Sequence, residues 1–298
     1  MSIVVNTNIQ SLIGQNSLTK STNMLNQTLE RLSTGLKINS SKDDAAGLGV
    51  VSLMTTQING NAQAIENIQD ATNLIQTAEG GLEIITENIQ RIRELCIQAA
   101  NEIYDENSRQ AIMNEIQQRL KVIDTTAATT NFNGKKLLDG SINSLFVQIG
   151  PNGDTVDADP LLNAIDVAPS LTQASSESLG IDLKVTALGS AGGDAIDATT
   201  WTTQQVRDYI NQLDAALTQI SNDRSVMGAF MNAMDSAAQN LTSTNISLES
   251  ARSAIQDADV ASLSADMVRY QILQQTSTSV LAQANQMPSL ALTLLAGY

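Results

Sequence analysis

The chain has 298 residues, 42% of them hydrophobic, so one large domain or two modest ones can form a core. Its net charge of −15 repels phosphate and anionic lipid, which argues against nucleic acid as a partner. It contains no histidine, which excludes imidazole zinc sites, His general bases and Ser-His-Asp triads. We therefore expect neither enzymatic activity nor a cofactor or metal.

Charge is distributed unevenly along the chain. Residues 1–19 and 271–298 contain no Asp, Glu, Lys or Arg, although both ends are amphipathic. Surface helices of a soluble monomer normally carry interspersed charges. Such uncharged ends are suited to burial against each other or against copies of themselves. No apolar run reaches 18 residues and the first residues do not resemble a signal peptide, so we expect no membrane span and no secretory leader.

Two stripes of apolar residues mark the ends of the chain as amphipathic helices. We expect the two helices to pack on each other and to form the core of a polymer. The first stripe includes Leu25, Leu29, Leu32 and Leu36, and the last comprises Leu273, Val280, Ala284, Met287 and Leu294 with Ala291.

Three further helices are predicted between the two ends. Apolar residues at heptad spacing predict a long helix from about residue 65 to 103, and Gly80 and Gly81 weaken it without ending it. A turn at 104–108 offers Asp105 among its helix caps and precedes a shorter helix to Ile123. The third helix, over about 204–255, is interrupted by Arg224 and Asn245 and would be roughly 75 Å long.

The stretch between residues 134 and 193 is different in character. It holds three of the four prolines, and the short alternating segment 145–149 precedes a turn-like Gly-Pro-Asn-Gly. This pattern predicts a hairpin and a small β region rather than helix. The expected domains are therefore 1–44 with 256–298, then 45–140 with 201–255, and a β/loop region at 141–200. The fold class is mainly α, with long antiparallel coiled-coil-like helices from both ends.

A few residues could be mistaken for chemical sites. Asp43 and Asp44 directly precede a predicted helix, so we interpret both as helix caps. Asp154, Asp157 and Asp159 begin like a calcium loop but lack its glycine and closing glutamate, which indicates a solvated acidic loop. Cys96 lies in an apolar seam, where a buried thiol is expected to be inert.

Several long motifs, in order along the chain, closely resemble bacterial flagellins. They are LSTGLKINSSKDDAAGL at 32–48, QTAEGGL at 76–82, IQRIRELCIQAAN at 89–101, NFNGK at 131–135 and QILQQTSTSVLAQANQ at 271–286. The resemblance covers about the first 140 and the last 95 residues, and the short middle implies that large outer domains are absent. Phe230–Met234 and the ending after Pro288 depart from the family pattern.

The resemblance implies a structural subunit that polymerises into the flagellar filament and serves swimming motility. It further implies export through the flagellar type III pathway and an extracellular filament, or a periplasmic flagellum. The expected partners are other copies of the chain, flagellar junction and cap proteins, and an export chaperone on the C-terminal region. The uncharged ends would become ordered on polymerisation. A hook–filament junction protein and a soluble coiled-coil adaptor are the alternatives; the intact central motifs and the uncharged ends favour flagellin.

The resemblance also points to an innate-receptor site. In flagellins that the vertebrate toll-like receptor recognises, contacts centre on a Gln-Arg-x-Arg-Glu-Leu helix and on a Glu of the next helix. The matching positions are Gln90, Arg91, Leu95 and Glu115.

Overall fold

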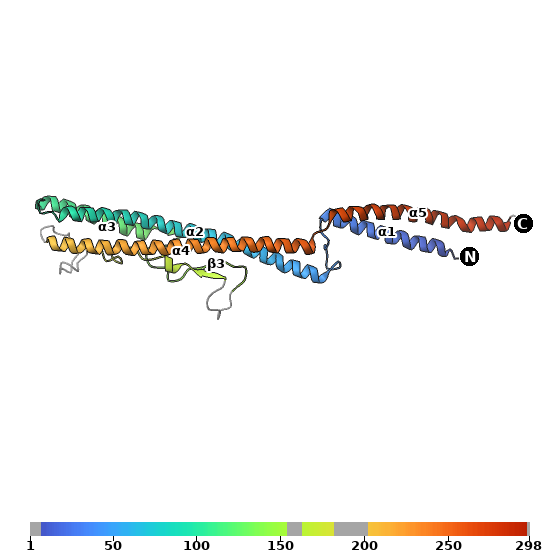
Figure 1. The fold of residues 1–298 in the computed structure, drawn as a ribbon, viewed down its shortest axis with the longest axis horizontal. Helices are drawn as coiled ribbons and strands as arrows, with labels where there is room; N and C mark the ends of the chain where they lie inside the picture. Colours follow the sequence, from blue (N-terminus) through green and yellow to red (C-terminus); the bar gives the residue numbers. More distant parts are fainter. Residues whose placement is uncertain (1–6, 154–162, 182–201, 297–298) are drawn as a thin grey trace. The chain divides into compact units, whose positions relative to one another are not determined.

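The computed structural model describes residues 7–153, 163–181 and 202–296, with side chains as far as Met287 (Figure 1). It confirms the predicted fold class, because long helices dominate and the strands are short. The elements are α1 (Ile9–Thr34), α2 (Ala45–Ala99), α3 (Glu106–Thr129), β1 (Asn131–Phe132), β2 (Lys135–Lys136), β3 (Phe146–Gln148), β4 (Ala164–Asp166), the 3₁₀ helix η1 (Ala168–Ser170), α4 (Thr203–Gln256) and α5 (Val260–Ala296).

The chain divides into two compact units. The terminal unit comprises residues 1–56 and 246–298, and the central unit comprises residues 57–245. α2 and α4 each contribute to both units. The expected domain boundaries at 44/45 and 255/256 stay predictions.

The core of the central unit lies between α2, α3 and α4. Its α2 residues follow alternating steps of 3 and 4, the spacing that keeps one helix face against a partner. On α4 the same spacing runs from Val206 to Met234, and α3 adds Ile112, Ile116 and Ile123. The α2 positions that are completely buried are Ile75, Ala78, Leu82, Ile85, Ile89, Ile92 and Cys96.

Both polar interruptions of the α4 seam meet polar partners on α2. Arg224 donates from Nη2 to Glu79 Oε1 at 3.2 Å. Asn245 accepts at Oδ1 from Asn61 Nδ2 at 2.8 Å, and Asn61 is only 2% exposed. These contacts give Arg224 and Asn61 one polar partner each, whereas Arg224 Nε and Asn61 Oδ1 have no hydrogen bond among the described residues.

The helix ends follow local capping chemistry. Asp105 accepts from the backbone N–H of Ser108 and caps α3, as predicted. Thr202 and Gln205 form a reciprocal capping box before α4, with Gln205 N bonded to Thr202 Oγ1 and Thr202 N bonded to Gln205 Oε1.

One hairpin was predicted and another was missed. β3 pairs antiparallel with β4, which confirms a strand within 145–149. β1 and β2 form a second hairpin around Asn133 and Gly134, whose φ values of 48° and 78° are those of a type I′ turn. Its signal was the Asn-Gly pair in the family motif.

Gly81 explains why a glycine is tolerated in the middle of α2. A Cβ built on Gly81 would lie 2.8 Å from both Leu138 Cδ1 and Thr130 Oγ1. The missing side chain therefore lets the segment around β1 and β2 approach the helix closely. The helix continues through both glycines, as predicted.

Candidate assembly surface

α1 and α5 form an antiparallel pair that makes up most of the terminal unit (Figure 1). The direction follows from cross-helix hydrogen bonds, in which Asn8 Nδ2 donates to Ala284 O at 2.7 Å and Gln274 Nε2 donates to Thr22 Oγ1 at 3.1 Å. This confirms the predicted pairing of the two chain ends as antiparallel helices.

The seam between α1 and α5 is built from small and polar residues as well as apolar ones. The buried residues of α1 are Ser11, Gly14, Leu25 and Thr28. Gly14 packs directly on α5, because a Cβ built there would lie 3.3 Å from Leu281 Cδ1. Ser11 Oγ donates to Asn285 Oδ1 at 2.7 Å. The sequence reasoning missed these residues because it followed leucines, whereas the full 3-and-4 spacing passes through Ser, Gly and Thr.

Two short connectors lie beside each other at the end of this pair. Leu36 and Asp257 form an antiparallel bridge, with Lys37 N bonded to Gln256 O at 2.7 Å and Ala258 N bonded to Gly35 O at 3.0 Å. Gly35 ends α1 in the left-handed region, at φ 73°. The bridge ties the segment after α1 to the segment before α5.

The two aspartates before α2 have different roles, which corrects half of the prediction. Asp44 accepts from the backbone N–H groups of Ala46 and Gly47 and is a helix cap, as expected. Asp43 does not cap the helix; it accepts from the N–H and the hydroxyl of Ser40 and lies 3.6 Å from Arg31 Nη2. The Ser40 hydrogen bonds hold the pKa of the Asp43 carboxyl below its usual 3.8. Asp43 thus fixes the segment between α1 and α2 through its contacts with Ser40 and Arg31.

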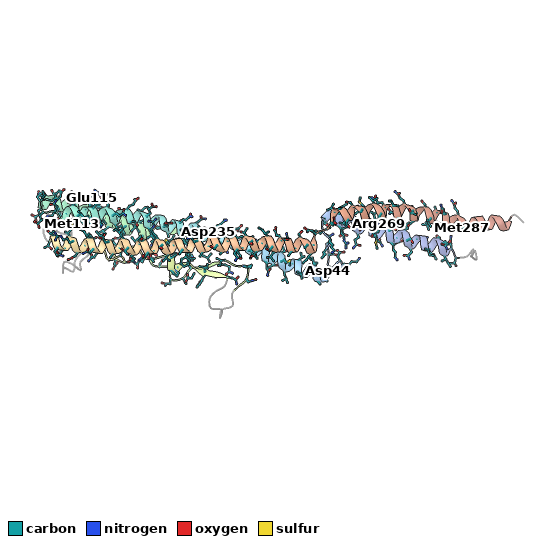
Figure 2. All side chains as sticks on the ribbon, in the orientation of Figure 1. Asp44, Met113, Glu115, Asp235, Arg269 and Met287 are labelled. Carbon is teal, nitrogen blue, oxygen red and sulfur yellow. The ribbon has the colours of Figure 1, made fainter. Side chains whose placement is uncertain are left out.

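Outside the seam, α1 and α5 expose large apolar side chains to solvent. We call this set the outer face, and each of its side chains is more than 40% exposed. Met287 is one of its members on α5, and Arg269 is the last charged residue of the chain (Figure 2). The outer face comprises Ile9, Leu12 and Ile13 of α1 with Val268, Ile272, Leu273, Val280 and Met287 of α5.

The predicted stripes divide between the seam and the exposed surface. Leu25 and Ala284 are buried in the seam, and Leu32 and Leu36 are half-buried. Leu29, Leu273, Val280 and Met287 are exposed, so the expectation that the two stripes pack on each other is wrong at these positions. The seam of α5 follows a different line, through Tyr270, Gln274, Ser277 and Leu281. The side chain of Leu294 lies outside those described.

The positions matched to the receptor site lie on α2 and α3 of the central unit. Arg91 Nε lies 3.4 Å from Glu115 Oε1, and Arg91 Nη1 lies 2.8 Å from Glu94 Oε2. Figure 2 labels Glu115 on α3. Gln90 is exposed, but Leu95 is only 2% exposed and belongs to the core. Arg91 and Glu115 are therefore brought together at the surface, and Leu95 is not part of that surface.

The remaining candidates are structural or lie outside the described residues. Cys96 is buried, and burial raises the pKa of its thiol to about 12. Met227 and Met234 are fully buried core residues. The acidic loop residues Asp154, Asp157 and Asp159 lie outside the described segments. Among the helices that the structure describes, none has the length and hydropathy needed to cross a bilayer.

The comparisons with known proteins agree with this arrangement. The family model for the bacterial flagellin N-terminal helical region matches residues 5–143, and the model for the C-terminal helical region matches residues 210–295. A flagellin of Xenorhabdus nematophila is 38% identical over 99% of this chain and 100% of its own length. A flagellin of Halalkalibacterium halodurans is 34% identical over 98% of this chain and 100% of its own length.

A solved structure shows the same fold. It is described as a flagellar hook-associated protein of Vibrio parahaemolyticus, with a TM-score of 0.52 and 15% identity over 72% of this chain and 99% of its own. The family models cover both helical ends, and the curated relatives match nearly the whole chain. The chain therefore belongs to the bacterial flagellin family.

Proposed function

We propose that this chain, a flagellar filament subunit by its family, joins the filament through the outer face of α1 and α5. The observation that carries the proposal is the exposure of eight large apolar side chains on a helix pair whose ends carry no formal charge. Large contiguous apolar surfaces on soluble proteins mark interaction sites. Burial of this surface would stabilise the assembled state.

A second copy of the same chain is the occupant that fits the outer face. Uncharged helices can be packed side by side without electrostatic repulsion, whereas like charges that face each other on identical neighbours repel. Apolar side chains on one copy can bury those on the next, at roughly 25 cal/mol for each Å² removed from water. The ends would gain their full order from neighbouring subunits, as segments that fold on binding do.

The other expected properties depend on the family and stay predictions. They are a structural rather than enzymatic role, an extracellular filament, and contacts with junction proteins, cap proteins and an export chaperone. Binding to the toll-like receptor is supported by the surface cluster of Arg91 and Glu115. A reporter-cell assay in which Arg91→Ala left signalling unchanged would argue against it.

The outer face can be tested by polar substitution on α5. We expect Leu273→Ser with Val280→Ser and Met287→Gln to abolish filaments under electron microscopy, because the buried apolar area between copies is lost. Far-UV circular dichroism of the dilute chain checks that the central unit still folds. Deletion of residues 271–298 should have the same effect.

The matched control removes exposed apolar side chains from the central unit. Ile84 and Ile97 of α2 are 47% and 51% exposed, similar to the α5 residues. The Ile84→Ser, Ile97→Ser variant should still form filaments. Filaments of normal yield from the α5 variant or from the truncated chain would refute the proposal.

A further inference from the structure

The chain contains two helix seams with the same spacing, of which the central one has more completely buried apolar side chains. In the central unit, the α2 seam buries Ile75, Leu82 and Ile85 completely. In the terminal unit, α1 buries Ser11, Gly14 and Thr28 together with one leucine, Leu25. Ala284 is the buried apolar residue among the α5 side chains that the structure describes. Because fewer apolar side chains are completely buried, the terminal pair is the weaker one.

Two polar layers cross the terminal seam. Ser11 bonds Asn285 near one end, and Thr22 bonds Gln274 near the middle. All four side chains have partners, so the layers do not prevent pairing. A polar residue at a seam position nonetheless lowers the stability of a coiled coil relative to an apolar one, since a hydrogen bond contributes little net free energy in water.

Charge does not compensate for the weak seam. The ion pairs described on these helices join Arg269 to Asp266 within α5, and Arg31 to Asp43 of the connector. Within the described residues no ion pair joins α1 to α5, because the helices are uncharged over most of their length. The polar layers, the buried Leu25 and Ala284 and a few half-buried leucines therefore hold the pair.

We propose that the two polar layers, Ser11–Asn285 and Thr22–Gln274, keep the free energy for opening the terminal helix pair small. The layers thereby set the subunit concentration at which filaments form. The inference rests on the proposed function. A pair that is partly open in the free chain must be closed during assembly, which raises the concentration that assembly needs. A more stable helix pair would already be closed before two subunits meet.

The test replaces one polar layer with leucine, in Thr22→Leu/Gln274→Leu. The control, Gln76→Leu/Thr77→Leu, makes the same residue changes at exposed positions of α2. Amide hydrogen exchange is measured on the dilute, unassembled chain, and the critical concentration is measured by sedimentation of filaments. We expect the seam variant to slow exchange in 9–34 and 260–287 by about tenfold or more and to lower the critical concentration by a similar factor.

Each outcome decides the proposal. It is overturned if exchange in the seam variant is unchanged, if exchange slows without any change in critical concentration, or if the control shows the same effects. Failure of the proposed function would look different, because the wild-type chain would then form no filaments at any concentration. The exchange measurement does not depend on filaments.

Discussion

Serine, glycine and glutamine at seam positions distinguish the terminal helices from most of the central seam. Ser11 and Gln274 occupy places that are isoleucine or leucine in the α2 seam. The leucine stripe near the start of the chain correctly indicated a helix. It could not show which leucines are buried, because Leu29 lies one step outside the line through Leu25 and Leu32.

Cys96 offers a test at the scale of one residue. Its thiol is completely buried, and its pKa is raised from 9.0 to about 12. We expect iodoacetamide at pH 9 to leave Cys96 unmodified in the native chain and to alkylate it after unfolding in urea, since the thiolate is the reactive form. Mass spectrometry after a timed quench gives the extent of reaction.

The same shift has a consequence for stability. The folded state favours the protonated thiol. The contribution of Cys96 to the free energy of unfolding is therefore complete below pH 9 and declines as the pH rises toward 12. Cys96→Ala should remove this part of the pH dependence. Rapid alkylation of the native protein at pH 9 would show that the seam around Cys96 is open.

At the scale of the helices, the 3-and-4 spacing predicted the elements well and their partners incompletely. It located α3 and α4 and the break at Asp105, because caps and apolar periodicity are local signals. It could not show that Asn245 meets Asn61, since that contact joins residues 184 apart in sequence. Nor did it identify the β1–β2 hairpin, where each strand has only two residues.

The Asn61–Asn245 contact supplies a test of the α2–α4 seam. Asn61→Leu alone should destabilise the central unit by about 1–3 kcal/mol, because Asn245 loses its partner within the seam. The double variant Asn61→Leu/Asn245→Leu should recover this loss, since both polar groups are then replaced by apolar ones. Urea unfolding followed by circular dichroism measures the free energies.

A double-mutant cycle separates the pair from its surroundings. The control is Gln63→Leu, at an exposed position of α2 where Gln63 Nε2 donates to Asn67 Oδ1 one turn along the same helix. If the two single substitutions of Asn61 and Asn245 were simply additive in the double variant, the two amides would not be coupled. Coupling is expected because Asn61 Nδ2 and Asn245 Oδ1 are only 2.8 Å apart.

For the whole molecule, nearly all of the net negative charge lies in the central unit. Residues 57–245 contain 24 Asp and Glu against 10 Lys and Arg, a net −14, whereas the rest of the chain contains 7 against 6, a net −1. The terminal unit can therefore approach its copies with little repulsion, while the central units of neighbouring copies repel one another.

This asymmetry predicts a salt dependence of assembly. Raising NaCl from about 10 to 150 mM shortens the screening length from about 30 to 8 Å, so repulsion between central units should weaken. We expect the critical concentration for filaments to fall over this range. Sedimentation at a series of salt concentrations gives the value; a rise with salt would mean that attraction between charges, and not apolar burial, holds the copies together.

The antiparallel seam of α2 and α4 also bears on how the chain withstands cleavage. The two helices belong to opposite halves of the sequence, and their buried contacts include Ile75, Leu82, Leu213 and Met227. Cleavage of one peptide bond between β3 and β4 would give two polypeptides, which the buried seam would still hold together. We expect the two polypeptides of the nicked molecule to stay associated until a denaturant unfolds the core between them.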